Sequence, residues 1–144
     1  MKVINCFASI TVILVFSCSK SSLQNESNPD STEIKLDSTI NGTTMTYHSG
    51  QRFSLELDLN ADSGYQWDYT ISDTNVVRID STNYRPKSGN WNQVGGITVE
   101  NFHFRTMRYG KSEIKLKQLR AWLPTVPPID TVIFSVLVIN REEG

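Results

Sequence analysis

Hydrophobic and polar residues alternate along most of the chain with a period of two, which predicts β-strands rather than helices. The clearest case is segment 53–59, where the apolar positions are Phe53, Leu55, Leu57 and Leu59. This alternation is typical of a strand with one face in the core and one in solvent. It recurs in shorter form in four more segments, which we also expect to be strands: 67–71, 77–79, 102–106 and 114–118.

Segment 129–139 differs because both of its faces are apolar, which predicts a central strand or one covered on both sides. Turn residues separate the predicted strands, and Tyr109-Gly110-Lys111 is expected to close a hairpin. No stretch of ten residues has helical periodicity. Seven to eight short strands in about 110 residues predict an all-β fold, an immunoglobulin-like β-sandwich, with a closed barrel as the alternative.

The N-terminus has the pattern of an export signal. Eleven of the fourteen residues from Val3 to Phe16 are apolar, too few for a bilayer span of about 20 residues. The run ends where Ser17 precedes Cys18, which resembles a bacterial lipobox and implies that Cys18 becomes the lipidated mature N-terminus. The alternative is an ordinary cleaved signal with an incidental cysteine. We expect a signal peptide over 1–17 and a lipid-anchored lipoprotein of the bacterial cell envelope.

Residues 18–33 are almost entirely polar, so this segment cannot bury enough surface to fold and is expected to be a flexible tether. The folded domain should then be 34–144, expected to be a monomer. The 144-residue chain has 14 Lys and Arg against 15 Asp and Glu, a net charge of −1. This balance argues against a nucleic-acid partner, and no run of like charges offers a membrane-surface patch, so membrane contact is expected through the lipid only.

Catalysis, a metal and a cofactor are not expected from this sequence. Both cysteines lie in the first 18 residues, and the two histidines, His48 and His103, stand in no Ser/His/Asp or metal-ligand pattern. Ser63 lacks the surroundings of a nucleophile elbow. Asp58, Asp62 and Asp68 fit no calcium-loop spacing.

Three connections carry the candidate binding residues: 60–66, 81–96 and 119–128. A tryptophan lies in or beside each of them. Trp67 alternates with strand residues and is expected in the core, whereas Trp122 stands among prolines. A Trp on a Pro-stiffened loop loses little entropy on binding and suits an interface anchor, although a place in the core or at its rim is the alternative.

These connections resemble the three binding loops of the chagasin family, immunoglobulin-like inhibitors of papain-type cysteine proteases. The family patterns are Asn-Pro-Thr-Thr-Gly-Tyr/Phe, Gly-x-Gly-Gly and Arg-Pro-Trp. The corresponding segments here are Asn60-Ala61-Asp62-Ser63-Gly64-Tyr65, Gln93-Val94-Gly95-Gly96 and Arg120-Ala121-Trp122. They occur in the family's order, and the resemblance covers about residues 34–142. The departures from the family patterns are Ala61, Asp62, Ser63, Gln93 and Ala121.

The resemblance implies reversible, non-covalent inhibition, in which loops 60–66, 91–97 and 119–124 occlude the cleft of a papain-like protease. The implied protease-binding residues are Asn60, Ala61, Asp62, Ser63, Gly64, Tyr65, Gly95, Gly96, Arg120, Ala121 and Trp122. Asp62 is hypothesised either to shift specificity or to weaken inhibition, or else to stay solvated at the loop tip. The alternative function is a lipid-anchored binding module for an envelope protein, peptide or glycan, without protease inhibition.

Overall fold

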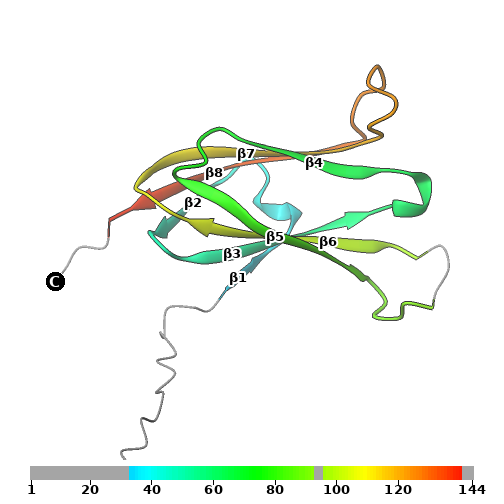
Figure 1. Ribbon diagram of the computed structural model, residues 1–144, viewed down its shortest axis with the longest axis horizontal. Helices are drawn as coiled ribbons and strands as arrows, with labels where there is room; N and C mark the ends of the chain where they lie inside the picture. The colour runs from blue at the N-terminus through cyan, green and yellow to red at the C-terminus, as the bar shows by residue number, and fades with distance from the viewer. Residues whose placement is uncertain (1–32, 93–95, 141–144) are drawn as a thin grey trace, which may run out of the picture.

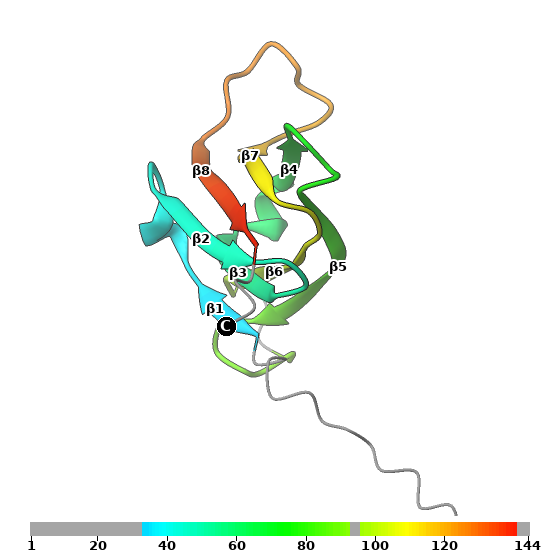
Figure 2. The ribbon, with the colours of Figure 1, turned by 90° about the vertical axis from the view of Figure 1, so that its left-hand side faces the viewer.

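The computed structural model describes residues 33–92 and 96–140, which form a sandwich of two four-stranded sheets (Figures 1 and 2). The first sheet has the order β1-β3-β6-β5 and the second the order β2-β8-β7-β4. The strands are β1 (Ile34–Leu36), β2 (Thr44–His48), β3 (Arg52–Leu59), β4 (Gln66–Ile71), β5 (Val77–Pro86), β6 (Thr98–Thr106), β7 (Gly110–Leu119) and β8 (Asp130–Ile139). Two short 3-10 helices complete the described part, η1 (Ser38–Ile40) and η2 (Ala61–Ser63). The predicted all-β sandwich is therefore confirmed.

The core lies between the facing sides of the two sheets and is built on aromatic residues. Phe53 on β3 stacks on Tyr47 at 4.7 Å and on Phe104 at 4.8 Å between ring centroids. Phe134 on β8 meets Phe53 edge-on at 6.4 Å. Such aromatic pairs add to the stabilisation from buried apolar area. The alternating residues of β3, β6, β7 and β8 supply most of this core, as their sequence pattern predicts.

Two sequence predictions are wrong in detail. Tyr109-Gly110-Lys111 does not close a hairpin, because β6 and β7 belong to different sheets and the chain crosses the sandwich there. Segment 81–86 is not a loop, because β5 continues to Pro86 through an irregularity between Ile79 and Ser81. The polar side chains of this segment show no strand-like alternation, because past the irregularity β5 is an exposed edge strand that needs no apolar face.

Strand β8 lies between β2 and β7, in agreement with the predicted central position. One of its faces is buried in the core, but the other is half-buried at Ile133 and Leu137 and exposed at Ile139. No helix of the described residues is long and apolar enough to span a membrane.

The register of the two sheets places the three loops at the same end of the sandwich. In the first sheet Thr98, where β6 begins, pairs with Leu59 and with Pro86, where β3 and β5 end. In the second sheet Gln66 at the start of β4 pairs with Leu119 at the end of β7. The loops 60–65 and 120–129, together with the described parts of loop 87–97, therefore lie at the end on the right of Figure 1.

Candidate functional site

The first loop is a single tight turn between β3 and β4. Asn60 precedes η2, and the backbone N–H of Ser63 donates to the carbonyl of Asn60 at 3.3 Å. Gly64 follows with φ +73°, a left-handed conformation that glycine adopts without a Cβ clash. Asp62 is exposed at the tip of the turn. The side chain of Ala61 lies outside what the structure describes.

The third loop is folded by its own backbone. The N–H of Leu123 donates to the carbonyl of Arg120 at 3.0 Å, and the N–H of Val126 donates to that of Leu123 at 3.0 Å. Where the loop returns to β8, the N–H of Ile129 donates to the carbonyl of Gln118 at 2.9 Å. These bonds, together with prolines that fix φ, restrict the loop to few conformations.

Arg120 joins the third loop to the first. Its Nε donates to the carbonyl oxygen of Ser63 at 3.0 Å, and the centre of its guanidinium lies 4.5 Å from the centroid of the Tyr65 ring. A charged hydrogen bond contributes about 1.5–3 kcal/mol and a partly exposed cation–π contact about 0.5–1 kcal/mol. Tyr65 is half-buried and packs against the core, so Arg120 fixes both loops to the sandwich.

Trp122 makes the second contact between these loops. A Cβ placed on Gly64 would lie 2.4 Å from Cη2 and 2.8 Å from Cζ2 of Trp122. The indole therefore packs so closely on Gly64 that any side chain at this position would clash with it. The ring is nevertheless 61% exposed, which leaves a large apolar surface free for a partner. Trp122 therefore does not lie in the core, and its role as an interface anchor stays a prediction.

Trp67 supports the first loop from below. It is 7% exposed, and its Nε1 donates to the carbonyl of Asp58 at 3.1 Å. Gln118 on β7 donates from Nε2 to the same carbonyl at 3.3 Å. The predicted core position of Trp67 is confirmed, and the two bonds tie the end of β3 to β4 and β7 directly beneath the loop.

The second loop is described except for residues 93–95, so the predicted contact residue Gly95 lies outside the described residues. Its base is closed by the N–H of Lys87, which donates to the carbonyl of Ile97 at 2.8 Å. Trp91 is 72% exposed on this loop. Gly96 is half-buried beside the start of β6.

Exposed large hydrophobic side chains lie on the second and third loops. We call this set the loop-end patch; it consists of Trp91, Ile97, Trp122, Leu123, Val126 and Ile129. Exposed hydrophobic side chains concentrated at one end of a domain are typical of an interaction site. Sequence reasoning missed Ile97, Leu123, Val126 and Ile129. The signal that could have found them is the presence of aliphatic residues within Pro- and Gly-containing connections, where no strand face needs them.

The buried carboxyl of Glu100 lies on β6, three residues after the end of the second loop. It is 4% exposed and accepts a hydrogen bond from the Tyr84 hydroxyl at 3.0 Å. Burial raises the pKa of Glu100 above its ordinary value, against the smaller opposing effect of that hydrogen bond. Among the described residues, no group of three or more His, Cys, Asp or Glu side chains could hold a metal ion.

Solved structures show the same fold in three proteins. A cysteine protease inhibitor from Entamoeba histolytica, EhICP2, is 18% identical over 77% of this chain and 99% of its own, with a TM-score of 0.68. Amebosin is 20% identical over 75% of this chain and 99% of its own, with a TM-score of 0.62. PbICP-C, solved in complex with falcipain-2, is 18% identical over 76% of this chain and 92% of its own, with a TM-score of 0.50.

No curated protein matches the chain significantly in sequence. The family model described as chagasin family peptidase inhibitor I42 matches residues 46–136, which is more than half of the chain and includes all three loops. The chain therefore belongs to the chagasin family of peptidase inhibitors.

Proposed function

We propose that this protein is a reversible, non-covalent inhibitor of papain-like cysteine proteases, with its three loops filling the active-site cleft. The observation that carries the proposal is the connection between the first and third loops. Arg120 bonds to Ser63 and stacks on Tyr65, while Trp122 covers Gly64. Two loops far apart in sequence thus form one rigid projection with an apolar tip.

This projection explains how inhibition works without a covalent bond. Rigid loops lose little conformational entropy when they enter a cleft, so more of the contact energy remains as affinity. The exposed indole of Trp122 supplies the kind of aromatic anchor that dominates interface energetics. Family membership supports the target class, as do two structural neighbours, one a cysteine protease inhibitor and the other solved in complex with falcipain-2.

Asp62 is proposed to face the catalytic pair of the protease. In a papain-type site the cysteine is a thiolate and the histidine an imidazolium. The carboxylate of Asp62 is exposed in the free protein and loses its water on binding. That loss is costly unless the carboxylate meets the imidazolium. Asp62 therefore selects proteases whose histidine is accessible from the first loop.

The test is a titration of papain and of a cathepsin L-type protease with the purified protein, using a fluorogenic peptide substrate. We expect competitive, reversible inhibition at submicromolar concentration. Trp122→Ala should abolish most of it. The matched control is Tyr109→Ala, which removes an aromatic residue that is 71% exposed in the turn between β6 and β7 at the opposite end. Equal effects of the two variants would contradict the proposed site.

We also propose that the protein is held on the bacterial cell envelope by lipid on Cys18 and acts there as a monomer. The support is the apolar run that ends at Cys18 in a lipobox-like sequence. Mass spectrometry of the N-terminal peptide tests the anchor, since Cys18 should carry diacylglycerol and Cys18→Ser should release the protein from membranes. Light scattering of the unlipidated Cys18→Ser variant tests the monomer.

A further inference from the structure

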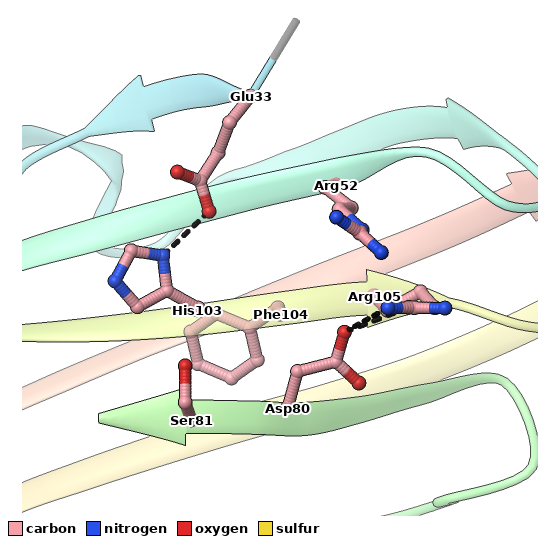
Figure 3. Close-up of a pocket in the computed structure, with 7 residues that line it drawn as sticks. All are labelled: Glu33, Arg52, Asp80, Ser81, His103, Phe104 and Arg105. Carbon is pink, nitrogen blue, oxygen red and sulfur yellow. Dashed lines mark hydrogen bonds and ion pairs between the residues drawn. The ribbon is translucent and has the colours of Figure 1, made fainter. Parts of the chain in front are cut away.

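The outer face of the first sheet carries a polar hollow away from the loop end (Figure 3). Its volume is about 330 Å³, and it lies where β1 and β3 begin and β6 ends. Its lining residues come from β3, β5, β6 and the residue directly before β1: Glu33, Arg52, Asp80, Ser81, His103, Phe104 and Arg105. The hollow is therefore separate from the loop-end patch.

Three arginines stand side by side across neighbouring strands, and two of them, Arg52 and Arg105, line this hollow. Arg105 on β6 pairs in register with Arg52 on β3 and with Arg78 on β5. We call these three residues the arginine row. Like charges directly opposite each other on neighbouring strands are destabilising, so such a row needs negative charge to offset it.

The chain supplies only part of that charge. Asp80, at the irregularity of β5, lies 2.7 Å from Nη2 of Arg105 and 3.3 Å from Nε of Arg78. Arg52 makes no ion pair with any residue that the structure describes. One carboxylate thus pairs with two of the three guanidinium groups, and the five N–H donors of Arg52 have no charged partner among the described residues.

The other carboxylate of the hollow is already engaged. Glu33 Oε1 lies 2.6 Å from Nδ1 of His103, and Nε2 of His103 lies 2.8 Å from Nδ2 of Asn83. An amide nitrogen only donates, so Nε2 accepts and the ring proton is on Nδ1, from which it is donated to Glu33. This chain of bonds holds Glu33 on His103, away from Arg52 (Figure 3).

We propose that the hollow binds a phosphate-type oxyanion between Arg52 and Arg105. A phosphate dianion supplies the charge that the arginine row lacks, and its oxygens match the fork of a guanidinium group. In Figure 3 the two guanidinium groups lie on the same side of the hollow. The Ser81 side chain completes the polar lining with a hydroxyl donor.

A phosphate group of this kind comes from a free phosphate or from the headgroup of a lipid. Glu33 lines the hollow and directly precedes β1, so in sequence the hollow adjoins the segment that connects β1 to Cys18. The intervening residues span at most about 50 Å when extended. A headgroup is therefore within reach if Cys18 carries lipid, but the oxyanion site itself does not depend on the anchor or on protease inhibition.

The test is a titration of the full chain in dodecyl maltoside with inorganic phosphate at pH 7.5, followed by the backbone amide resonances of Arg105 and Ser81. Chloride at equal ionic strength is the reference. We expect saturable shifts with phosphate, about tenfold weaker binding in Arg52→Gln, and unchanged binding in Arg108→Gln, which removes the same charge at an exposed position outside the hollow. Unsaturated shifts, or equal affinity in the two variants, would overturn the proposal.

Two further readouts sharpen this test. Without phosphate, Arg52→Gln should not lower the thermal unfolding midpoint, because it removes a like charge beside Arg105. A lowered midpoint would show that Arg52 serves the fold and would overturn the proposal. Short-chain phosphatidic acid distinguishes the two sources: tighter binding than phosphate supports a headgroup, and equal or weaker binding supports a free oxyanion.

Discussion

Gly64→Ala is the substitution that most sharply separates the stability of the first loop from its binding. Gly64 has φ +73°, and Gly89 in the second loop has the same φ. A non-glycine residue in this conformation costs roughly 1–2 kcal/mol. The difference between the two positions lies in their surroundings: a Cβ on Gly64 would be 2.4 Å from the Trp122 ring, whereas a Cβ on Gly89 meets nothing within 4 Å.

The Trp122 ring is 61% exposed, so it can move away from a new methyl group into solvent. We therefore expect Gly64→Ala and Gly89→Ala to lower the free energy of unfolding by similar amounts, roughly 1–2 kcal/mol each. The two variants should differ in inhibition, because only Gly64→Ala displaces Trp122. Displacing an aromatic anchor costs about 2 kcal/mol or more of binding energy, which is about 30-fold in the inhibition constant.

The assay pairs urea unfolding with inhibition of papain for both glycine variants. A third variant, Gly64→Ala in the Trp122→Ala background, tests the cause, because the glycine substitution should add little once the ring is gone. The reasoning is refuted if Gly64→Ala and Gly89→Ala weaken inhibition equally, or if Gly64→Ala has its full effect without Trp122.

Further predictions concern four other side chains. Arg120→Lys should weaken inhibition about tenfold by losing the bond to Ser63 and the stack on Tyr65, and unchanged inhibition would show that this connection is dispensable. Asp62→Thr should change the ranking of inhibition among papain-like proteases, and an identical ranking would rule out a contact with their catalytic pair. Trp91→Ala should weaken inhibition without lowering the free energy of unfolding, since the ring is 72% exposed; a stability loss would place it in the fold instead. Burial raises the pKa of Glu100, so its contribution to stability is present below about pH 4.5 and is lost as the pH rises through the folded-state pKa. Glu100→Gln should therefore flatten the fall in unfolding free energy from pH 4.5 to pH 7, and an unchanged slope would contradict the assignment.

The strands of the core could be predicted from the sequence because one face of each strand meets the apolar core, whereas the other face carries mostly polar side chains. Phe53, Leu55, Leu57 and Leu59 lie in the core on β3, and their alternation with polar residues predicts a strand. The extension of β5 could not be predicted, since segment 81–86 lies on an edge strand where polar side chains cost nothing. The crossing at Tyr109 could not be predicted either, because a tight turn is equally suited to a hairpin and to a passage between sheets.

The loop residues could be found by resemblance, but their arrangement could not. The sequence contains Gly64 and Arg120 as separate motif positions, 56 residues apart. Only the pairing of β4 with β7 brings them together, so that Arg120 bonds to Ser63 and Trp122 covers Gly64. The arginine row is likewise invisible in the sequence, since Arg52, Arg78 and Arg105 meet only through strand register.

Occlusion of the protease cleft is the central claim, and calorimetric binding to blocked papain tests it most directly. Papain is compared in two forms, one with a free cleft and one whose catalytic cysteine carries a covalent peptidyl inhibitor that fills the cleft. The account predicts reversible binding to the first form and no measurable binding to the second. Equal affinity for both forms would show that the loops bind elsewhere on the protease and would contradict the claim.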